Sequence, residues 1–155
     1  MPFDPPPQRW RSRRRSRKNL NQSRRSYAKF NKPRGVPSVL AYEGATHIGW
    51  CSIAPRETYI RLEKSKTMPR VTPPETPTWS VLCSFVARRC RGQRVSQVLL
   101  EGAVAWARLQ GAKIVEGYPF DTAGISSTHR GHSHVFEATR FQSDANRWSR
   151  RLRGR

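Results

Sequence analysis

The sequence predicts one α/β domain of about a hundred residues, preceded by a basic tail that has no core of its own. The first observation is the uneven distribution of charge: of the net charge of +20, +11 lies in residues 1–34, where twelve lysines and arginines accompany Asp4 alone. Residues 35–139 carry only +4. The second observation is a strand–helix–strand succession with short connections, which is typical of a parallel β-strand pair.

The tail has a composition typical of disorder. Residues 2–8 are proline-rich, and proline favours extended backbone. Residues 9–34 are rich in arginine, serine and asparagine, with isolated aromatic residues. This composition offers too little apolar surface to offset the conformational entropy lost on folding. We therefore expect a disordered tail over residues 1–34 and a folded domain over residues 35–155.

The first half of the domain predicts a hairpin followed by a short helix and a loop. Ser38–Tyr42 and His47–Ile53 are β-rich segments on either side of the turn residue Gly44. Thr58–Lys64 is predicted to be a short helix. Met68–Pro77 contains four prolines and is predicted to be a loop.

The second half contains the strand–helix–strand unit. Trp79–Ala87 reads as a central strand, and a basic turn follows at Arg88–Arg94. From Val95 to Leu109 apolar residues recur at helical spacing, and Gly111 provides the C-terminal stop. Lys113–Tyr118 is the next strand. Beyond it we expect a loop, a helix and a strand, at Phe120–His132, His134–Thr139 and Phe141–Leu152.

Composition narrows the class of protein. Cys51, Cys83 and Cys90 are odd in number and show no metal-ligand spacing, so buried thiols in a reducing compartment are the simplest interpretation. No apolar run approaches the roughly 20 residues of a membrane helix, and no apolar segment follows the basic N-terminus as in a secretory signal. We expect a cytoplasmic protein that makes no contact with membranes.

The turn at Arg88–Arg94 is the main candidate for a binding site. A strand runs into a basic turn and directly into a helix, whose first backbone N–H groups and dipole favour an anion. The alternative is an ordinary strand–helix connection with surface arginines. One glycine in the turn does not decide between them.

Three motifs carry a family resemblance. Residues 85–100, FVARRCRGQRVSQVLL, resemble the acyl-CoA motif of the GNAT superfamily of N-acetyltransferases, with Arg91 and Gly92 at matching positions. Residues 49–57, GWCSIAPRE, resemble a hairpin strand and loop of bacterial members. Residues 135–141, VFEATRF, resemble the family's Leu-Tyr-Glu-x-x-Gly-Phe.

The resemblance implies a fold and a donor site. It implies an α+β domain with a mixed, splayed β-sheet flanked by helices, and acetyl-CoA as cosubstrate without a metal. The pantetheine arm would lie along the backbone of Phe85 and Val86. The pyrophosphate would accept hydrogen bonds from the backbone N–H groups of Gly92, Gln93, Arg94, Val95 and Ser96. Arg91 would lie beside these donors. The acceptor would be an unidentified amine, on a small molecule or a protein.

Three departures from the family pattern bear on activity. Arg94 stands where the motif has glycine, which imposes no Cβ near the phosphates. Phe136 stands where a tyrosine often protonates the departing thiolate. Arg140 stands at the glycine of the last motif. The family's first strand and helices also have no recognisable counterpart upstream of Val36.

Two residues are candidates for catalysis. Glu116 would lie across the expected splay, where a carboxylate can relay the amine proton to water; the alternative is a solvent-facing glutamate. Tyr118 is a candidate replacement acid; the alternative is a packing tyrosine. His129, His132 and His134 invite a zinc interpretation, but no cysteine or acidic residue is suitably near, so we expect no metal site.

A second function of a different class remains open. The run Arg11–Lys18 would bind nucleic acid non-specifically through phosphates. With Arg94 and Phe136, it supports a catalytically silent acetyltransferase-like scaffold that binds nucleic acid. The oligomeric state is not predicted.

Overall fold

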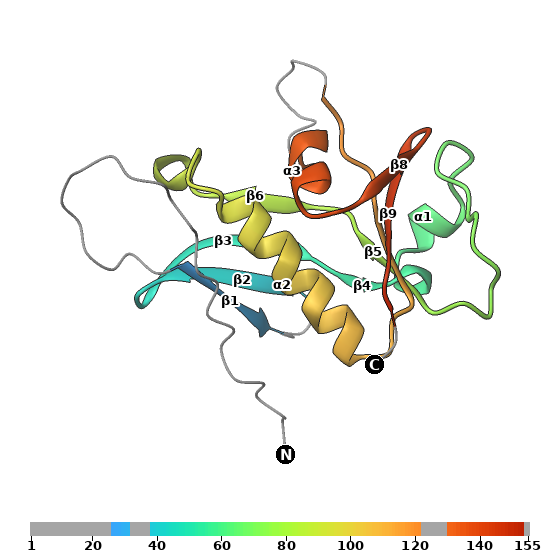
Figure 1. The fold of residues 1–155 in the computed structure, drawn as a ribbon, viewed down its shortest axis with the longest axis horizontal. Coiled ribbons are helices and arrows are strands. Elements are labelled where there is room, and N and C mark those ends of the chain that lie inside the picture. Colours follow the sequence, from blue (N-terminus) through green and yellow to red (C-terminus); the bar gives the residue numbers. More distant parts are fainter. Residues whose placement is uncertain (1–25, 32–37, 122–129, 154–155) are drawn as a thin grey trace.

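The computed structural model describes residues 26–31, 38–121 and 130–153, which form two β-sheets and three α-helices (Figure 1). The first sheet has the order β1-β2-β3-β6 and is antiparallel throughout. Its strands are β1 (Ser26–Asn31), β2 (Ser38–Glu43), β3 (Thr46–Ser52) and β6 (Ser84–Val86). The second sheet has the order β4-β5-β7-β9-β8. Its strands are β4 (Ala54–Pro55), β5 (Thr78–Val81), β7 (Ile114–Gly117), β8 (Gln142–Asp144) and β9 (Arg147–Arg151).

Strand β1 corrects the predicted domain boundary. It lies inside residues 1–34, which the composition predicts to be tail, and pairs with β2 along its whole length. An edge strand is held by backbone hydrogen bonds to its neighbour, which do not require a hydrophobic side-chain pattern. The folded unit therefore extends to Ser26. Residues 1–25, with the basic run at Arg11–Lys18, lie outside the described part of the chain.

The predicted central strand Trp79–Ala87 is two strands that belong to different sheets. Up to Val81, β5 runs parallel to β7. After Leu82 and Cys83 the chain resumes as β6, which pairs with β3. The two sheets therefore diverge at this point, and the mixed, splayed architecture predicted from the sequence is confirmed.

Helix α2 (Val95–Leu109) covers one face of the first sheet, as Figure 1 shows. Its buried face consists of Val95, Leu99, Leu100, Ala103, Val104 and Ala107. Gly111 adopts a φ of 87° after the helix ends, which confirms the predicted stop. Leu109, expected on the apolar face, is 56% exposed because it lies in the last turn, beyond the sheet.

A long segment lies against the face of the second sheet on which Arg56 bonds to Glu116 of β7. It begins with a 3₁₀ turn, Arg56–Thr58, continues as α1 (Ile60–Glu63), and ends in the proline-rich loop before β5. The helix prediction for Thr58–Lys64 is confirmed, shortened at both ends.

The C-terminal region holds α3 (Ser133–Ala138) and a hairpin. The predicted single strand Phe141–Leu152 is wrong: β8 and β9 pair antiparallel around a turn in which Ala145 has a φ of 52°. None of the helices in the described ranges has both the length and the apolar character needed to span a membrane.

Candidate functional site

The splay leaves one edge of β6 open. Next to β6, the Ser52 N–H donates to the Cys83 carbonyl and the Ala87 N–H to the Ile48 carbonyl, both at 2.8 Å. Because hydrogen-bonded pairs alternate along an antiparallel ladder, the intervening Phe85 also turns its backbone groups toward β3. Those of Ser84 and Val86 therefore face the other side. In the described ranges no strand pairs with β6 on that side.

The strand register distinguishes the two residues that the family resemblance names for the pantetheine arm. Val86 turns its polar groups to the open edge and Phe85 does not. Ser84, which the sequence reasoning did not single out, takes the second place. Only the strand register distinguishes these residues, and a sequence does not reveal register directly. The Val86 carbonyl already accepts a hydrogen bond from Arg91 Nε at 3.2 Å.

Beyond β6 the chain forms a loop of weakly bonded N–H groups. Arg88–Cys90 is a 3₁₀ turn, Gly92 has a φ of 72°, and Arg94 caps α2 with a φ of 62° and a ψ of 17°. Residues 91–94 form a turn, but within the described ranges no backbone N–H of residues 92–96 makes a short, well-aligned bond to another backbone group. Gln97 and Val98 already donate to the Arg94 carbonyl. Successive N–H groups that are only weakly bonded at a helix N-terminus form a site for an anion.

The side chains around this loop add positive charge. Arg91, Gly92, Gln93 and Arg94 are exposed, and so are Arg88 and Arg89. Gln93 donates to the Arg89 carbonyl at 3.1 Å, which braces the turn. Among the described residues no carboxylate pairs with any of these four arginines. Val95 is buried beneath the loop, and Ser96 lines a cavity behind it.

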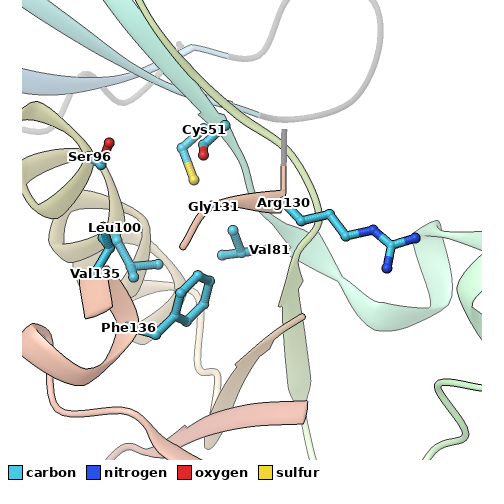
Figure 2. Close-up of a pocket in the computed structure, with 9 residues that line it drawn as sticks. Cys51, Val81, Ser96, Leu100, Arg130, Gly131, Val135 and Phe136 are labelled. Carbon is cyan, nitrogen blue, oxygen red and sulfur yellow. The ribbon is translucent and has the colours of Figure 1, made fainter. Parts of the chain in front are cut away.

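The cavity lies where the two sheets diverge. It has a volume of about 10 Å³ and is lined by residues from both sheets, α2 and α3, most of which Figure 2 labels. The lining residues are Cys51, Val81, Ser84, Ser96, Leu100, Arg130, Gly131, Val135 and Phe136. Phe136 is buried and packs over Gly117 at the end of β7. A Cβ at Gly117 would lie 2.3 Å from Phe136 Cε1, so only glycine permits this contact.

Glu116 lies in a fully buried ion pair on the opposite face of the second sheet. Its Oε1 atom accepts from Arg56 Nη1, from Ser80 Oγ at 2.8 Å and from Tyr118 Oη at 2.9 Å. Arg147 Nη1 lies 3.6 Å from its Oε2 atom. Glu116 is therefore neither the solvent-facing residue of one interpretation nor free to exchange protons with water.

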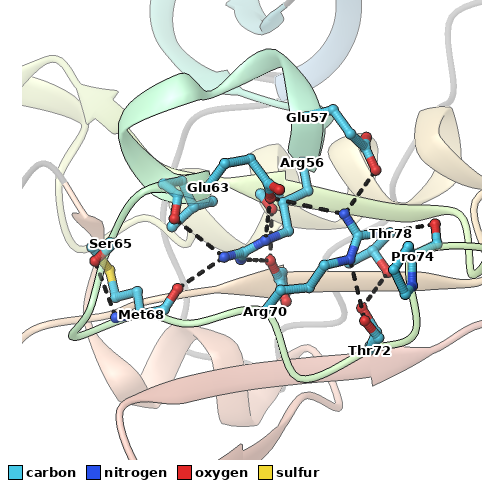
Figure 3. A network of polar contacts seen from close by, with 12 residues as sticks. Arg56, Glu57, Glu63, Ser65, Met68, Arg70, Thr72, Pro74 and Thr78 are labelled. Atoms are coloured by element: carbon cyan, nitrogen blue, oxygen red, sulfur yellow. Dashed lines mark hydrogen bonds and ion pairs between the residues drawn. The ribbon is translucent and has the colours of Figure 1, made fainter.

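Arg56 organises this network, as Figure 3 shows. The guanidinium is fully buried, and it bonds the Met68 carbonyl at 2.8 Å and the Leu62 carbonyl at 3.3 Å. Its Nε lies 2.7 Å from Glu63 Oε1. Burial lowers the pKa of Arg56, but the bonds to Glu116 and Tyr118 outweigh it and the net pKa is raised. Arg56 thereby fastens the α1 segment to β7.

Tyr118 belongs to the same network rather than to the cavity. Its hydroxyl donates to Glu116 and accepts from Arg56. Burial, followed by the charge of Glu116, raises its pKa above the ordinary value for tyrosine. The side chain does not line the cavity at the splay. The arrangement makes Glu116 and Tyr118 supports of the sheet.

Sequence reasoning missed Arg56, although a signal existed. Glu116 sits in an apolar strand, and a buried carboxylate requires a partner. Arg56 follows an apolar run and is the complementary buried charge. What the sequence did not reveal is that the turn after β4 lies against β7.

The remaining candidates show no site chemistry. All three cysteines are free; Cys51 and Cys90 are buried and Cys83 is half-buried. Burial raises the pKa of Cys51 to about 12, which suppresses thiolate formation. The imidazole rings of His132 and His134 are stacked, with their centroids 5.6 Å apart. His129 lies outside the described residues. No cluster of metal-ligating side chains occurs in the part of the chain that the structure describes.

Comparisons with known proteins agree with this geometry. The sequence model of the Acetyltransferase (GNAT) family matches residues 5–121. No curated protein shows detectable similarity. The solved structure of a protein assigned to the GNAT family of acetyltransferases, from Desulfovibrio desulfuricans, superposes with a TM-score of 0.52 at 18% identity. The superposition covers 76% of this chain and 69% of the Desulfovibrio chain.

A second solved structure was determined with a ligand. It is yncA from Salmonella typhimurium, a protein assigned as an acetyltransferase and solved with its cofactor acetyl-CoA. The TM-score is 0.52 and the identity 15%, and the superposition covers 77% of this chain and 66% of yncA. These identities support the shared fold alone. The family match extends over most of the chain, and the protein belongs to the Acetyltransferase (GNAT) family.

Proposed function

We propose that this protein transfers the acetyl group of acetyl-CoA to an amine. The observation that carries the proposal is that two stretches of available backbone follow each other along the chain. The open edge of β6, at Ser84 and Val86, is joined by the 3₁₀ turn Arg88–Cys90 to the weakly bonded N–H groups of residues 92–96. An extended amide-containing arm suits the first feature, and a pyrophosphate suits the second.

The chain's contribution is mainly to positioning. The loop donors and exposed arginines would fix the phosphates, and the β6 edge would align the thioester, which carries the acetyl carbon that the amine attacks. A carbon–nitrogen bond forms and the carbon–sulfur bond breaks. The nitrogen loses one proton and the thiolate gains one. Holding two reactants in this way is itself a large source of rate.

Proton transfer would proceed through water. Glu116 and Tyr118, predicted from the sequence as relay and acid, are held by Arg56 on the far face of the sheet. We propose that they support β7 instead. Phe136 lines the cavity but has no hydroxyl to protonate sulfur. The chemical step is therefore expected to be slow.

The test is release of free thiol from acetyl-CoA in the presence of single primary amines, including small polyamines and lysine-containing peptides. The expected result is amine-dependent thiol release, with a product heavier than the amine by one acetyl group. Thiol release that no amine accelerates would contradict the proposal.

A nucleic-acid-binding role is the alternative. The concentration of charge in residues 1–34 favours it. That role predicts retention on nucleic acid that weakens steeply with salt.

A further inference from the structure

The opening between the two sheets is filled by the chain itself. The Phe120 N–H, three residues beyond β7, donates to the Gly131 carbonyl at 3.1 Å. On the other side, a Cβ at Gly131 would point to Ser84 Oγ at 3.7 Å and to Phe136 Cε2 at 3.3 Å. Gly131 therefore lies between the segment that follows β7 and the Ser84 side chain of β6. Figure 2 shows Gly131 at the cavity, with the Arg130 side chain pointing away from it.

The remaining space is far too small for a ligand. The cavity behind Gly131 holds about 10 Å³, which is room for a single water molecule. Pockets for organic ligands measure roughly 300–1,000 Å³. An acyl-pantetheine arm and the Gly131 backbone thus compete for the same edge of β6.

We propose that Arg130–Gly131 is a plug which the acyl-pantetheine arm must displace, so that donor binding is coupled to opening of the splay. This inference rests on the proposed function. The nucleotide portion of the donor lies outside the competition, because Arg88, Arg89 and residues 91–94 of the loop are exposed to solvent. The plug therefore weakens binding of the whole donor and leaves binding of its nucleotide portion unaffected.

The backbone at Gly131 offers a way to loosen the plug. Its φ is 84°, a conformation that residues with a Cβ adopt at a cost. Gly131→Ala adds this strain, and it also crowds Phe136. Both effects disfavour the closed arrangement. When most molecules are in the closed state, the apparent affinity for acetyl-CoA is reduced in proportion to the fraction of open molecules. Destabilising the closed state by about 1–2 kcal/mol should therefore tighten acetyl-CoA binding by about 5–30-fold.

Gly111→Ala is the matched control. Gly111 has a φ of 87°, and no atom lies within 4 Å of the position that its Cβ would take. The variant adds the same methyl group and comparable backbone strain at the far end of α2. It should lose folding stability as Gly131→Ala does, and its affinity for acetyl-CoA should stay at the wild-type value.

The experiment is calorimetric titration of the wild type and both variants with acetyl-CoA and with adenosine bisphosphate, the nucleotide portion of coenzyme A. Tighter acetyl-CoA binding by Gly131→Ala alone, with adenosine bisphosphate binding equally to all three proteins, supports the plug. Unchanged or weaker acetyl-CoA binding by Gly131→Ala overturns it, while the proposed function stands. Absence of binding by either ligand to any of the three proteins overturns the proposed function, and the plug with it.

Stopped-flow binding to the wild type tests the same idea without a mutation. If opening precedes donor entry, the observed rate levels off as the acetyl-CoA concentration rises. The rate with adenosine bisphosphate should rise linearly. A linear rise with both ligands overturns the plug.

Discussion

Arg94 is the residue at which this chain departs most from its family, and the structure gives the physical reason why glycine is the usual choice. The residue caps α2 in the left-handed conformation, with a φ of 62°. A side chain in that conformation costs roughly 1–2 kcal/mol. Arg140, at the other glycine position of the family pattern, has a φ of 64°. Two arginines of this chain therefore adopt the left-handed backbone conformation that glycine adopts without strain.

Arg94→Gly should therefore stabilise the fold and tighten acetyl-CoA binding. Relief of strain, less the extra entropy of glycine in the unfolded chain, predicts a gain of up to about 1 kcal/mol, or about 2–4 °C in Tm. The tighter binding should persist at high salt, because the loop donors are backbone groups. Arg140→Gly is the control: it should raise Tm similarly and leave donor affinity unchanged. Weaker binding by Arg94→Gly would identify Arg94 as a phosphate ligand.

Glu116 and Arg56 should prove structural rather than catalytic. Glu116→Gln removes the buried carboxylate that pairs with the fully buried Arg56 guanidinium and leaves only the partly exposed Glu63 beside it. Loss of one member of a buried pair costs up to about 3–5 kcal/mol. Chemical denaturation measures this loss. Glu101→Gln breaks the half-exposed pair with Arg150 and should cost under about 1 kcal/mol. A stable Glu116→Gln protein that binds acetyl-CoA but has lost acetyl transfer would reassign Glu116 to proton transfer.

Among the elements, α3 carries the residue that bears on the chemical step. Phe136 extends from α3 into the cavity at the splay, packing edge-on to Phe141 at 5.1 Å. Phe136→Tyr would place a hydroxyl at this position. General acids contribute about 10²–10⁴-fold to rate, so acetyl transfer should accelerate within this range while acetyl-CoA affinity stays constant. An unchanged rate would show that position 136 does not face the sulfur, or that chemistry is not limiting.

The elements also show what could be predicted from sequence. The position of helix α2 was predicted because its apolar spacing and the following glycine are local signals. The division of Trp79–Ala87 into β5 and β6 was not predicted, since continuous β-rich residues do not show where a strand changes partner. The β8–β9 hairpin was missed because its turn, at Ala145, lacks the usual glycine. The loop residues 91–96 were predicted from family resemblance, whereas Ser84 and Arg56 depend on register and on long-range contact.

At the scale of the whole molecule, the described part of the chain begins with β1 at Ser26, and the sequence before it is strongly basic. Removing residues 1–25 should preserve a cooperative melting transition and acetyl-CoA affinity, and should reduce retention on nucleic acid. Removing residues 1–31 also deletes β1, which pairs with β2 over six positions and packs beside α2, so Tm should fall. Thermal melting and salt-dependent retention measure the two effects. A lower Tm after removal of residues 1–25 would assign that segment to the fold.

The central claim is that the open edge of β6 and the start of α2 together hold an acyl-CoA. An amide NMR titration of the isotope-labelled full chain with acetyl-CoA tests it most directly, because the donors of the β6 edge and of residues 92–96 are backbone N–H groups. The account predicts saturable shifts for residues 92–96 and for Ser84 and Val86, larger than those of Phe85, whose N–H is committed to β3. Saturable shifts confined to other parts of the chain, or no shifts at all, would contradict it.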